Sequence, residues 1–135
     1  MTDEERIDVV RYRIQNAEST MAEVESHKAN GFYNTAINRM YYACFYAVSA
    51  LLVANKIEVK SHDGARQKFG LFFVRTGKIS SELGKFYSLI FAKRTSGDYE
   101  DFINHDLDTV EKYQPQAQML IEEIKNLLSE FIDIK

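Results

Sequence analysis

The chain has 135 residues, of which 45% are hydrophobic, and it carries a formal net charge of −3 at pH 7. A chain of this length can bury a core without disulfides or a structural metal, so we expect a single domain over residues 1–135. The weakly acidic balance argues against a basic coat for duplex DNA, and the scarcity of six glycines and one proline favours long helices over a turn-rich β fold.

The first predicted helix covers about residues 3–28 and has a narrow apolar stripe. Its apolar side chains alternate spacings of three and four, as in a helix that faces a partner helix: Ile7, Val10, Ile14, Ala17, Met21 and Val24. Asn30 and Gly31 are residues that commonly end a helix. The second helix, over about residues 32–54, is apolar on nearly every face, which predicts a place in the middle of a bundle.

Two shorter helices are predicted after a connection over residues 56–63. The third helix is expected over about residues 64–75, with Ser61 or Asp63 as its N-cap. The fourth starts at residue 80 or 81. The side chains expected to face the core from these two helices are Ala65, Phe69, Phe72, Phe73, Leu83, Phe86, Leu89 and Ile90.

The last helix is predicted over about residues 106–131, after a loop over residues 94–105 that is rich in turn-forming residues. Pro115 either kinks this helix or marks a restart with Gln114 at the boundary. Its apolar spacing repeats that of the first helix: Val110, Tyr113, Ala117, Leu120, Ile124, Leu127 and Phe131. Two seam helices flanking one apolar helix predict an all-α fold, an antiparallel bundle of four to five helices.

The cellular setting is predicted from the cysteine count and the N-terminus. A single cysteine, Cys44, cannot form an intramolecular disulfide, which is typical of a reducing cytoplasm. The first residues contain no apolar signal region. The apolar run over residues 40–54 falls short of the roughly 20 residues needed to span a membrane. We therefore expect a cytoplasmic protein with no membrane contact.

Most familiar signatures of catalysis and cofactor binding are absent. There is no Gly-rich phosphate loop, no CxxC and no HExxH, so neither a cofactor nor a metal centre is predicted. One acidic cluster, Asp98, Glu100 and Asp101 around Tyr99, could hold Mg²⁺ together with phosphate oxygens. The simpler interpretation of this cluster is a solvated loop.

Arg39 is the one charged residue between Gly31 and Asn55. It either pairs with an acidic residue of the first or last helix, or lines a cleft that binds an anion. Tyr42 and Tyr46 share its helical face, and an arginine beside tyrosines could hold the base and phosphate of a nucleotide. Otherwise these tyrosines, with Tyr41, would serve core or dimer packing.

Arg94 and His62 are the other candidate site residues. Arg94 ends the fourth helix, where a cation suits the helix dipole, but its guanidinium could also bind phosphate in a bidentate manner. His62 lies in the connection before the third helix. It serves either as a cap or turn contact, or as an acid or base.

Four segments, in this order, carry a resemblance to a known family: NTAINRMYYACFYAVSALL (34–52), SHDG (61–64), FGLFFVRTGKIS (69–80) and KRTSGDYEDF (93–102). With them the chain resembles the HEPN domain family, in particular its small stand-alone prokaryotic members. The resemblance implies a bundle of four to five helices that forms a homodimer. Many members are encoded beside minimal nucleotidyltransferases and act in toxin–antitoxin or defence systems.

A large subset of that family are metal-independent ribonucleases whose motif is an arginine, four to six residues, then a histidine. Here no histidine stands five to seven positions after any arginine, and the positions after Arg94 are Tyr99, Glu100 and Asp101. Tyrosine, with an ordinary pKa of about 10, is a poor acid or base at neutral pH. The resemblance therefore carries Arg94, Asp98 and Tyr99 over as site positions without a catalytic role.

Three functions are consistent with these residues. The first is a module that binds a nucleotide or RNA, or docks a nucleotidyltransferase, through Arg94, Asp98, Tyr99, Arg39, Tyr42 and His62. The second is a divergent ribonuclease in which His62 or His105 reaches Arg94 and replaces the missing histidine. The third is a purely structural interaction protein in which Arg39 and Arg94 are ion-paired inside the bundle.

Overall fold

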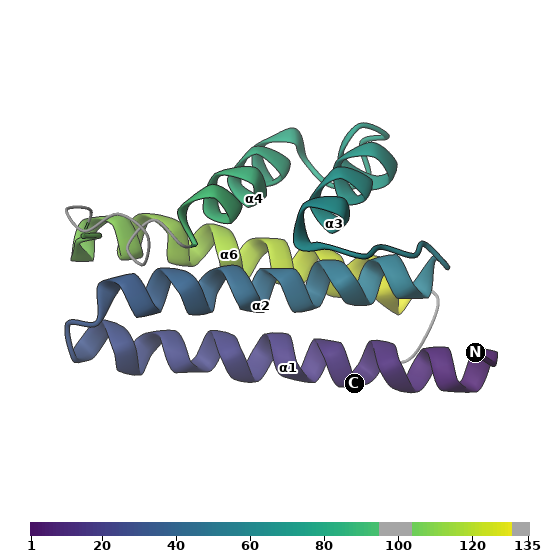
Figure 1. The fold of residues 1–135 in the computed structure, drawn as a ribbon, viewed down its shortest axis with the longest axis horizontal. Coiled ribbons are helices and arrows are strands. Elements are labelled where there is room, and N and C mark those ends of the chain that lie inside the picture. Colours follow the sequence, from purple (N-terminus) through teal and green to yellow (C-terminus); the bar gives the residue numbers. More distant parts are fainter. Residues whose placement is uncertain (95–103, 131–135) are drawn as a thin grey trace.

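The computed structural model describes residues 1–94 and 104–130. Three long helices lie side by side, and two shorter ones stack on one side of them (Figure 1). The elements are α1 (Asp3–Ala29), α2 (Tyr33–Ala54), α3 (His62–Phe69), the π-helical turn η1 (Gly70–Val74), α4 (Ser81–Lys93) and α6 (Leu107–Ser129). Within the described ranges there is no strand. The predicted all-α bundle is therefore confirmed.

The chain direction follows from one tight turn and one long excursion. Gly31 has φ 76°, a left-handed conformation that glycine adopts without strain, and it turns α1 back along α2 as an antiparallel pair. The excursion through α3, η1 and α4 returns the chain to the end where α2 began. As a result α6 runs alongside α2 in the same direction (Figure 1).

Side-chain caps fix where four helices begin. Because Ser61 accepts a hydrogen bond from the Gly64 amide at 2.8 Å, α3 starts at His62, two residues earlier than predicted, and Ser61 rather than Asp63 is the N-cap. The other capping residues are Thr2, Ser80 and Asp106.

The core is built around α2, which contacts α1, α3, α4 and α6. Its length and composition would allow it to cross a membrane, yet 67% of its most apolar window is buried inside the fold, as in a core helix. Twelve of its residues are buried: Ala36, Ile37, Met40, Tyr41, Ala43, Cys44, Ala47, Val48, Ser49, Ala50, Leu51 and Leu52. The predicted central position is confirmed.

Two side chains that the sequence predicts to face the core do not do so. Phe72 and Leu89 are each 41% exposed, so neither is a core residue. Phe72 lies in η1, where the Arg75 amide bonds to the Gly70 carbonyl, and the wider turn rotates this ring outward. Leu89 lies beside the buried stripe of α4. Of the two alternatives for Pro115, the helix restart is excluded, because α6 is continuous through this residue. Phe131 lies outside the described residues.

Gly84 allows α4 to pass close to η1. A Cβ at this position would lie 2.6 Å from Cγ1 of Val74, whereas a Cβ at Gly70 would meet nothing within 4 Å. We expect Gly84→Ala to lower the free energy of unfolding by about 1–3 kcal/mol, although alanine is the better helix former.

Urea unfolding of three variants tests this expectation. Gly84→Ala combined with Val74→Ala should recover part of the loss, since the clash is removed. Gly70→Ala is the matched control and should leave stability unchanged or raise it. Equal stability of Gly84→Ala and Gly70→Ala would contradict the close packing.

Candidate functional site

The first half of α2, the start of α3 and the end of α4 bring together five side chains from three separate segments of the sequence. We call Arg39, Tyr41, Tyr42, His62 and Arg94 the aromatic–arginine cluster. Arg39, Tyr41 and Tyr42 come from one turn of α2, His62 is the first residue of α3, and Arg94 directly follows α4. The cluster thus depends on long-range packing of three helices.

Arg94 lies on aromatic faces. Its Cζ is 5.3 Å from the ring centroid of Tyr41 and 4.3 Å from that of Phe91. Nη1 donates to the Phe91 carbonyl at 2.8 Å, and the Arg94 carbonyl accepts from Asn38 Nδ2 at 3.2 Å. Arg94 forms no ion pair with a carboxylate within residues 1–94 and 104–130.

Arg39 occupies a similar position one turn away. Its Cζ is 5.0 Å from the ring centroid of Tyr42, and Nη2 donates a long hydrogen bond, 3.4 Å, to Asn38 Oδ1. The side chain is half-buried. The alternative in which Arg39 pairs with an acidic residue of the first or last helix is not found in the described parts of α1 and α6.

His62 connects the two arginines through the tyrosines. Its ring stacks on Phe45 at a centroid distance of 4.0 Å, and its Nδ1 is 2.7 Å from the hydroxyl of Tyr41. Burial raises the pKa of Tyr41 to about 12, so this phenol keeps its proton and can donate to Nδ1. Burial, and then the positive charge of Arg94, lower the pKa of His62. The imidazole is therefore neutral at pH 7.

The described part of the cluster contains little negative charge to neutralise its arginines. The nearest carboxylate in the sequence, Asp63, is already paired with Arg66 at 2.6 Å and accepts from Gln67 at 2.8 Å. Tyr87, stacked on Tyr41 at 6.0 Å, has a buried hydroxyl without a hydrogen bond of ordinary geometry. Such an arrangement offers cationic donors for an anion and aromatic faces for a planar group.

The lowered pKa of His62 gives a testable pH dependence. Between the folded pKa and the ordinary value of 6.5 the unfolded chain binds more protons. The contribution of this residue to stability is therefore complete above pH 6.5 and is lost as the pH falls below it. We expect proton NMR to show His62 titrating below 6.5, and Arg94→Ala to move its pKa upward. An unchanged His62 pKa in Arg94→Ala, or an equal change in Arg75→Ala, would contradict the proximity.

The structure brings together only part of the predicted site. Arg39, Tyr42, His62 and Arg94 meet, whereas Asp98 and Tyr99 lie outside the described residues, as do Glu100 and Asp101. Tyr46 is half-buried and packs against Tyr42 and Phe45. His105 lies before α6, where its amide donates to Asn34 Oδ1 at 2.8 Å. Of the two histidines proposed to reach Arg94, the contacts favour His62.

Sequence reasoning missed three contributors. Asn38 and Phe45 flank the tyrosines on α2 at spacings of three and four, a signal that could have placed them on the same face. Phe91, three residues before Arg94, supports the guanidinium. Within residues 1–94 and 104–130, no group of three His, Cys, Asp or Glu side chains could hold a metal ion.

The model of the family described as "HEPN domain" matches residues 10–127 of this chain. A UPF0332 protein of Thermotoga maritima is 33% identical over 130 residues, which cover 96% of this chain and 97% of the relative. A Methanocaldococcus jannaschii protein named "Putative toxin MJ0605" is 30% identical, over 88% of each chain. A second from that organism, "Putative toxin MJ0142", is 28% identical over 85% of this chain and 78% of its own. With its fold and nearly all of its length matched, the chain belongs to the HEPN domain family.

Proposed function

We propose that this chain is a HEPN module of the toxin–antitoxin type that binds a nucleotide, or a segment of single-stranded RNA, through the aromatic–arginine cluster. One observation carries the proposal: Arg39 and Arg94 rest on tyrosine faces beside a neutral His62, and neither is paired with a described carboxylate. The toxin context is supported by the names of the two Methanocaldococcus relatives.

The chemistry of the cluster suits a ligand with both a phosphate and a base. A guanidinium stacked on a ring still presents N–H groups at its edge, and these bind phosphate oxygens with good geometry. Tyr42 is half-buried, so its ring remains available to a base. His62 would donate from Nε2, since its Nδ1 is occupied by Tyr41. Asp98 and Tyr99 belong to the proposed site by family resemblance.

The proposal includes a homodimer in the cytoplasm that docks a nucleotidyltransferase partner, as the resemblance implies. Two large apolar side chains on one turn, Leu71 and Phe72, are 44% and 41% exposed. Aromatic and aliphatic groups of this kind are common in subunit interfaces, and they support a contact through η1.

Titration of the wild-type protein with nucleoside mono- and triphosphates and with short single-stranded RNAs tests the binding function directly. Saturable binding should shift the amide resonances of α2 and the ring resonances of His62. No shift at millimolar ligand, either alone or with the nucleotidyltransferase partner present, would refute nucleotide and RNA binding.

A divergent ribonuclease is the second candidate, and the placement of His62 favours it. This role needs the other neutral tautomer, in which His62 Nδ1–H donates to the Tyr41 hydroxyl oxygen and Nε2 is unprotonated. Nε2 can then accept the proton of a ribose hydroxyl while the guanidiniums bind the phosphate. Purified protein should then cleave RNA without added metal, and His62→Ala and Arg94→Ala should both abolish cleavage. Intact RNA after long incubation with wild-type protein would argue against this function.

A further inference from the structure

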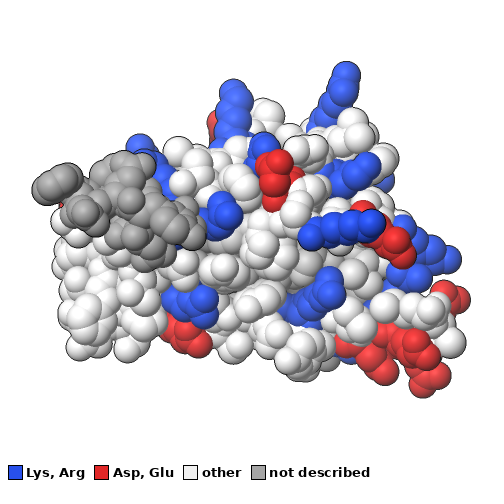
Figure 2. Space-filling view, viewed as in Figure 1, with Lys and Arg blue, Asp and Glu red and all other residues white. Residues whose placement is uncertain are grey.

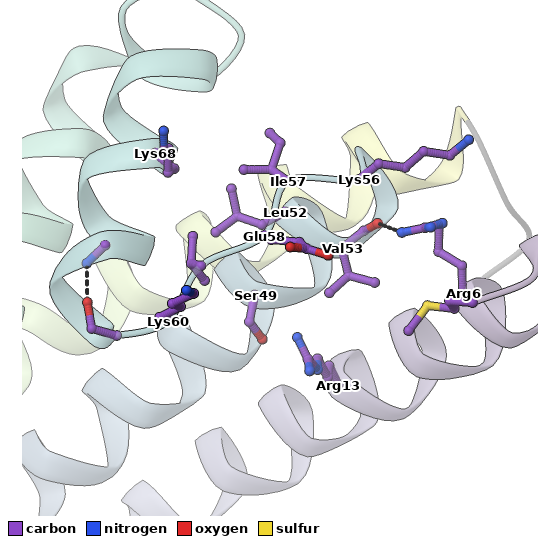
Figure 3. A pocket seen from close by; sticks show the side chains of 14 residues that line it. Arg6, Arg13, Ser49, Leu52, Val53, Lys56, Ile57, Glu58, Lys60 and Lys68 are labelled. Carbon is purple, nitrogen blue, oxygen red and sulfur yellow. Dashed lines mark hydrogen bonds between the residues drawn. The ribbon is translucent and has the colours of Figure 1, made fainter.

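A large groove lies further along α2 than the aromatic–arginine cluster, at the C-terminal end of that helix. It encloses about 930 Å³ between the first half of α1, the end of α2, the connection after α2 and α3 (Figure 3). This volume is within the usual range for sites that hold small organic ligands. None of the residues of the aromatic–arginine cluster lines this groove, which we call the basic groove.

The charge of the groove is unlike that of the whole chain. The chain has a net charge of −3, but the groove is lined by five cationic side chains and one carboxylate, Glu58. No ion pair joins any of the five to another residue within 1–94 or 104–130. They are Arg6, Arg13, Lys56, Lys60 and Lys68. Concave surfaces lined by one sign of charge concentrate the opposite ion.

Arg6 has a buried donor that lacks a hydrogen-bond acceptor in this groove. It reaches from α1 to the end of α2, where Nη1 donates to the Val53 carbonyl at 2.8 Å (Figure 3). Its Nε is buried and has no hydrogen-bond partner. A buried donor without an acceptor costs stability, and an anion that draws the guanidinium toward the groove would satisfy it.

The remaining cations are spread around the cavity and come from different segments. Arg13 extends from α1 toward the groove, Lys56 and Lys60 come from the connection, and Lys68 comes from α3 (Figure 3). Four apolar residues also line the groove: Leu52, Val53, Ile57 and Val59. A single small anion would contact the cations on one side of the groove only, whereas an extended anion could contact cations on several sides at once.

We propose that the basic groove is a second anion site, which takes a ligand carrying two or more phosphate groups. Phosphate is favoured because the two arginines present forks that match its oxygens, and because lysines bind it as point charges. A free polyphosphate and the backbone of an RNA strand share this chemistry. The site does not depend on ligand binding at the aromatic–arginine cluster.

Two probes and two double variants test the proposal. The probes are inorganic tripolyphosphate, measured by calorimetry, and a labelled single-stranded RNA of about twelve nucleotides, measured by anisotropy. Arg13→Ala with Lys60→Ala removes one cation from each side of the groove. Arg75→Ala with Lys112→Ala is the matched control, because it removes the same charges from exposed positions outside it.

We expect the groove variant to bind at least one probe about tenfold or more weakly than the control, with a salt dependence reduced by roughly two phosphate contacts. Loss of tripolyphosphate binding identifies a free polyphosphate as the ligand, and loss of RNA binding alone identifies an RNA backbone. In an Arg94→Ala background, which weakens phosphate binding at the cluster, the groove variant should still bind tripolyphosphate more weakly than the control, which separates this site from the cluster.

Equal binding of both probes by the two double variants would overturn the proposal. So would displacement of tripolyphosphate by a glutamate-rich peptide of the same charge at the same concentration, because the groove would then select negative charge rather than phosphate. Matching melting temperatures of the two double variants establish that the comparison concerns folded protein.

Discussion

Arg94→Ala should weaken nucleotide or RNA binding by about a hundredfold or more. Hydrogen bonds to a charged partner are worth about 1.5–3 kcal/mol each, and a guanidinium supplies two of them to one phosphate. Arg94 also places its charge over the Tyr41 ring at 5.3 Å, so its removal changes the surface on which a base would stack. The measurement is the dissociation constant of the ligand found by titration.

Two further variants separate binding from folding, because Arg94 also donates to the Phe91 carbonyl at the end of α4. Arg94→Lys keeps the charge but loses the fork, and it should recover only part of the affinity. Arg75→Ala removes an exposed arginine elsewhere and should bind as the wild type does. Wild-type affinity in Arg94→Ala would remove the cluster from the binding site.

Leu51→Ala should lower the free energy of unfolding by about 2–5 kcal/mol. Leu51 is 0% exposed in α2, a helix that packs against α1, α3, α4 and α6. A close-packed core of this kind can collapse only partly onto a missing side chain. Since a domain of this size is typically stable by about 5–15 kcal/mol, the loss is a large share of the total. Urea unfolding, followed by circular dichroism, measures it.

Leu89→Ala is the matched control for this core substitution. It makes the same chemical change in a helix, but Leu89 is 41% exposed on α4, so the expected loss is below about 1 kcal/mol. Similar losses in the two variants would mean that α2 is not the centre of the core.

The long helices could be predicted because their apolar spacing repeats over many residues. In α1 five of the six predicted seam residues are buried, and only Ile7, in the second turn, is half-buried. The same spacing rule failed at Phe72, because it assumes an α-helical turn and the chain there winds as a π-helix. Periodicity thus describes regular helices well and cannot anticipate a local change in winding.

The cluster was predictable only along α2. Arg39 and Tyr42 share a face through their spacing of three, which sequence alone shows. The contacts of His62 and Arg94 with Tyr41 join residues that are 21 and 53 positions apart in the chain, and they arise from how α3 and α4 pack on α2. Such contacts are tertiary and leave no periodic signal. The groove arginines Arg6 and Arg13 were missed for the same reason.

The burial of Cys44 makes the single thiol a reporter of breathing motions. The side chain is 0% exposed, and burial raises its pKa far above the ordinary value, so almost no reactive thiolate exists in the folded chain. An alkylating reagent can therefore reach it only after α2 separates from its neighbours. Under conditions where closing is faster than alkylation, the labelling rate measures the equilibrium population of that open form.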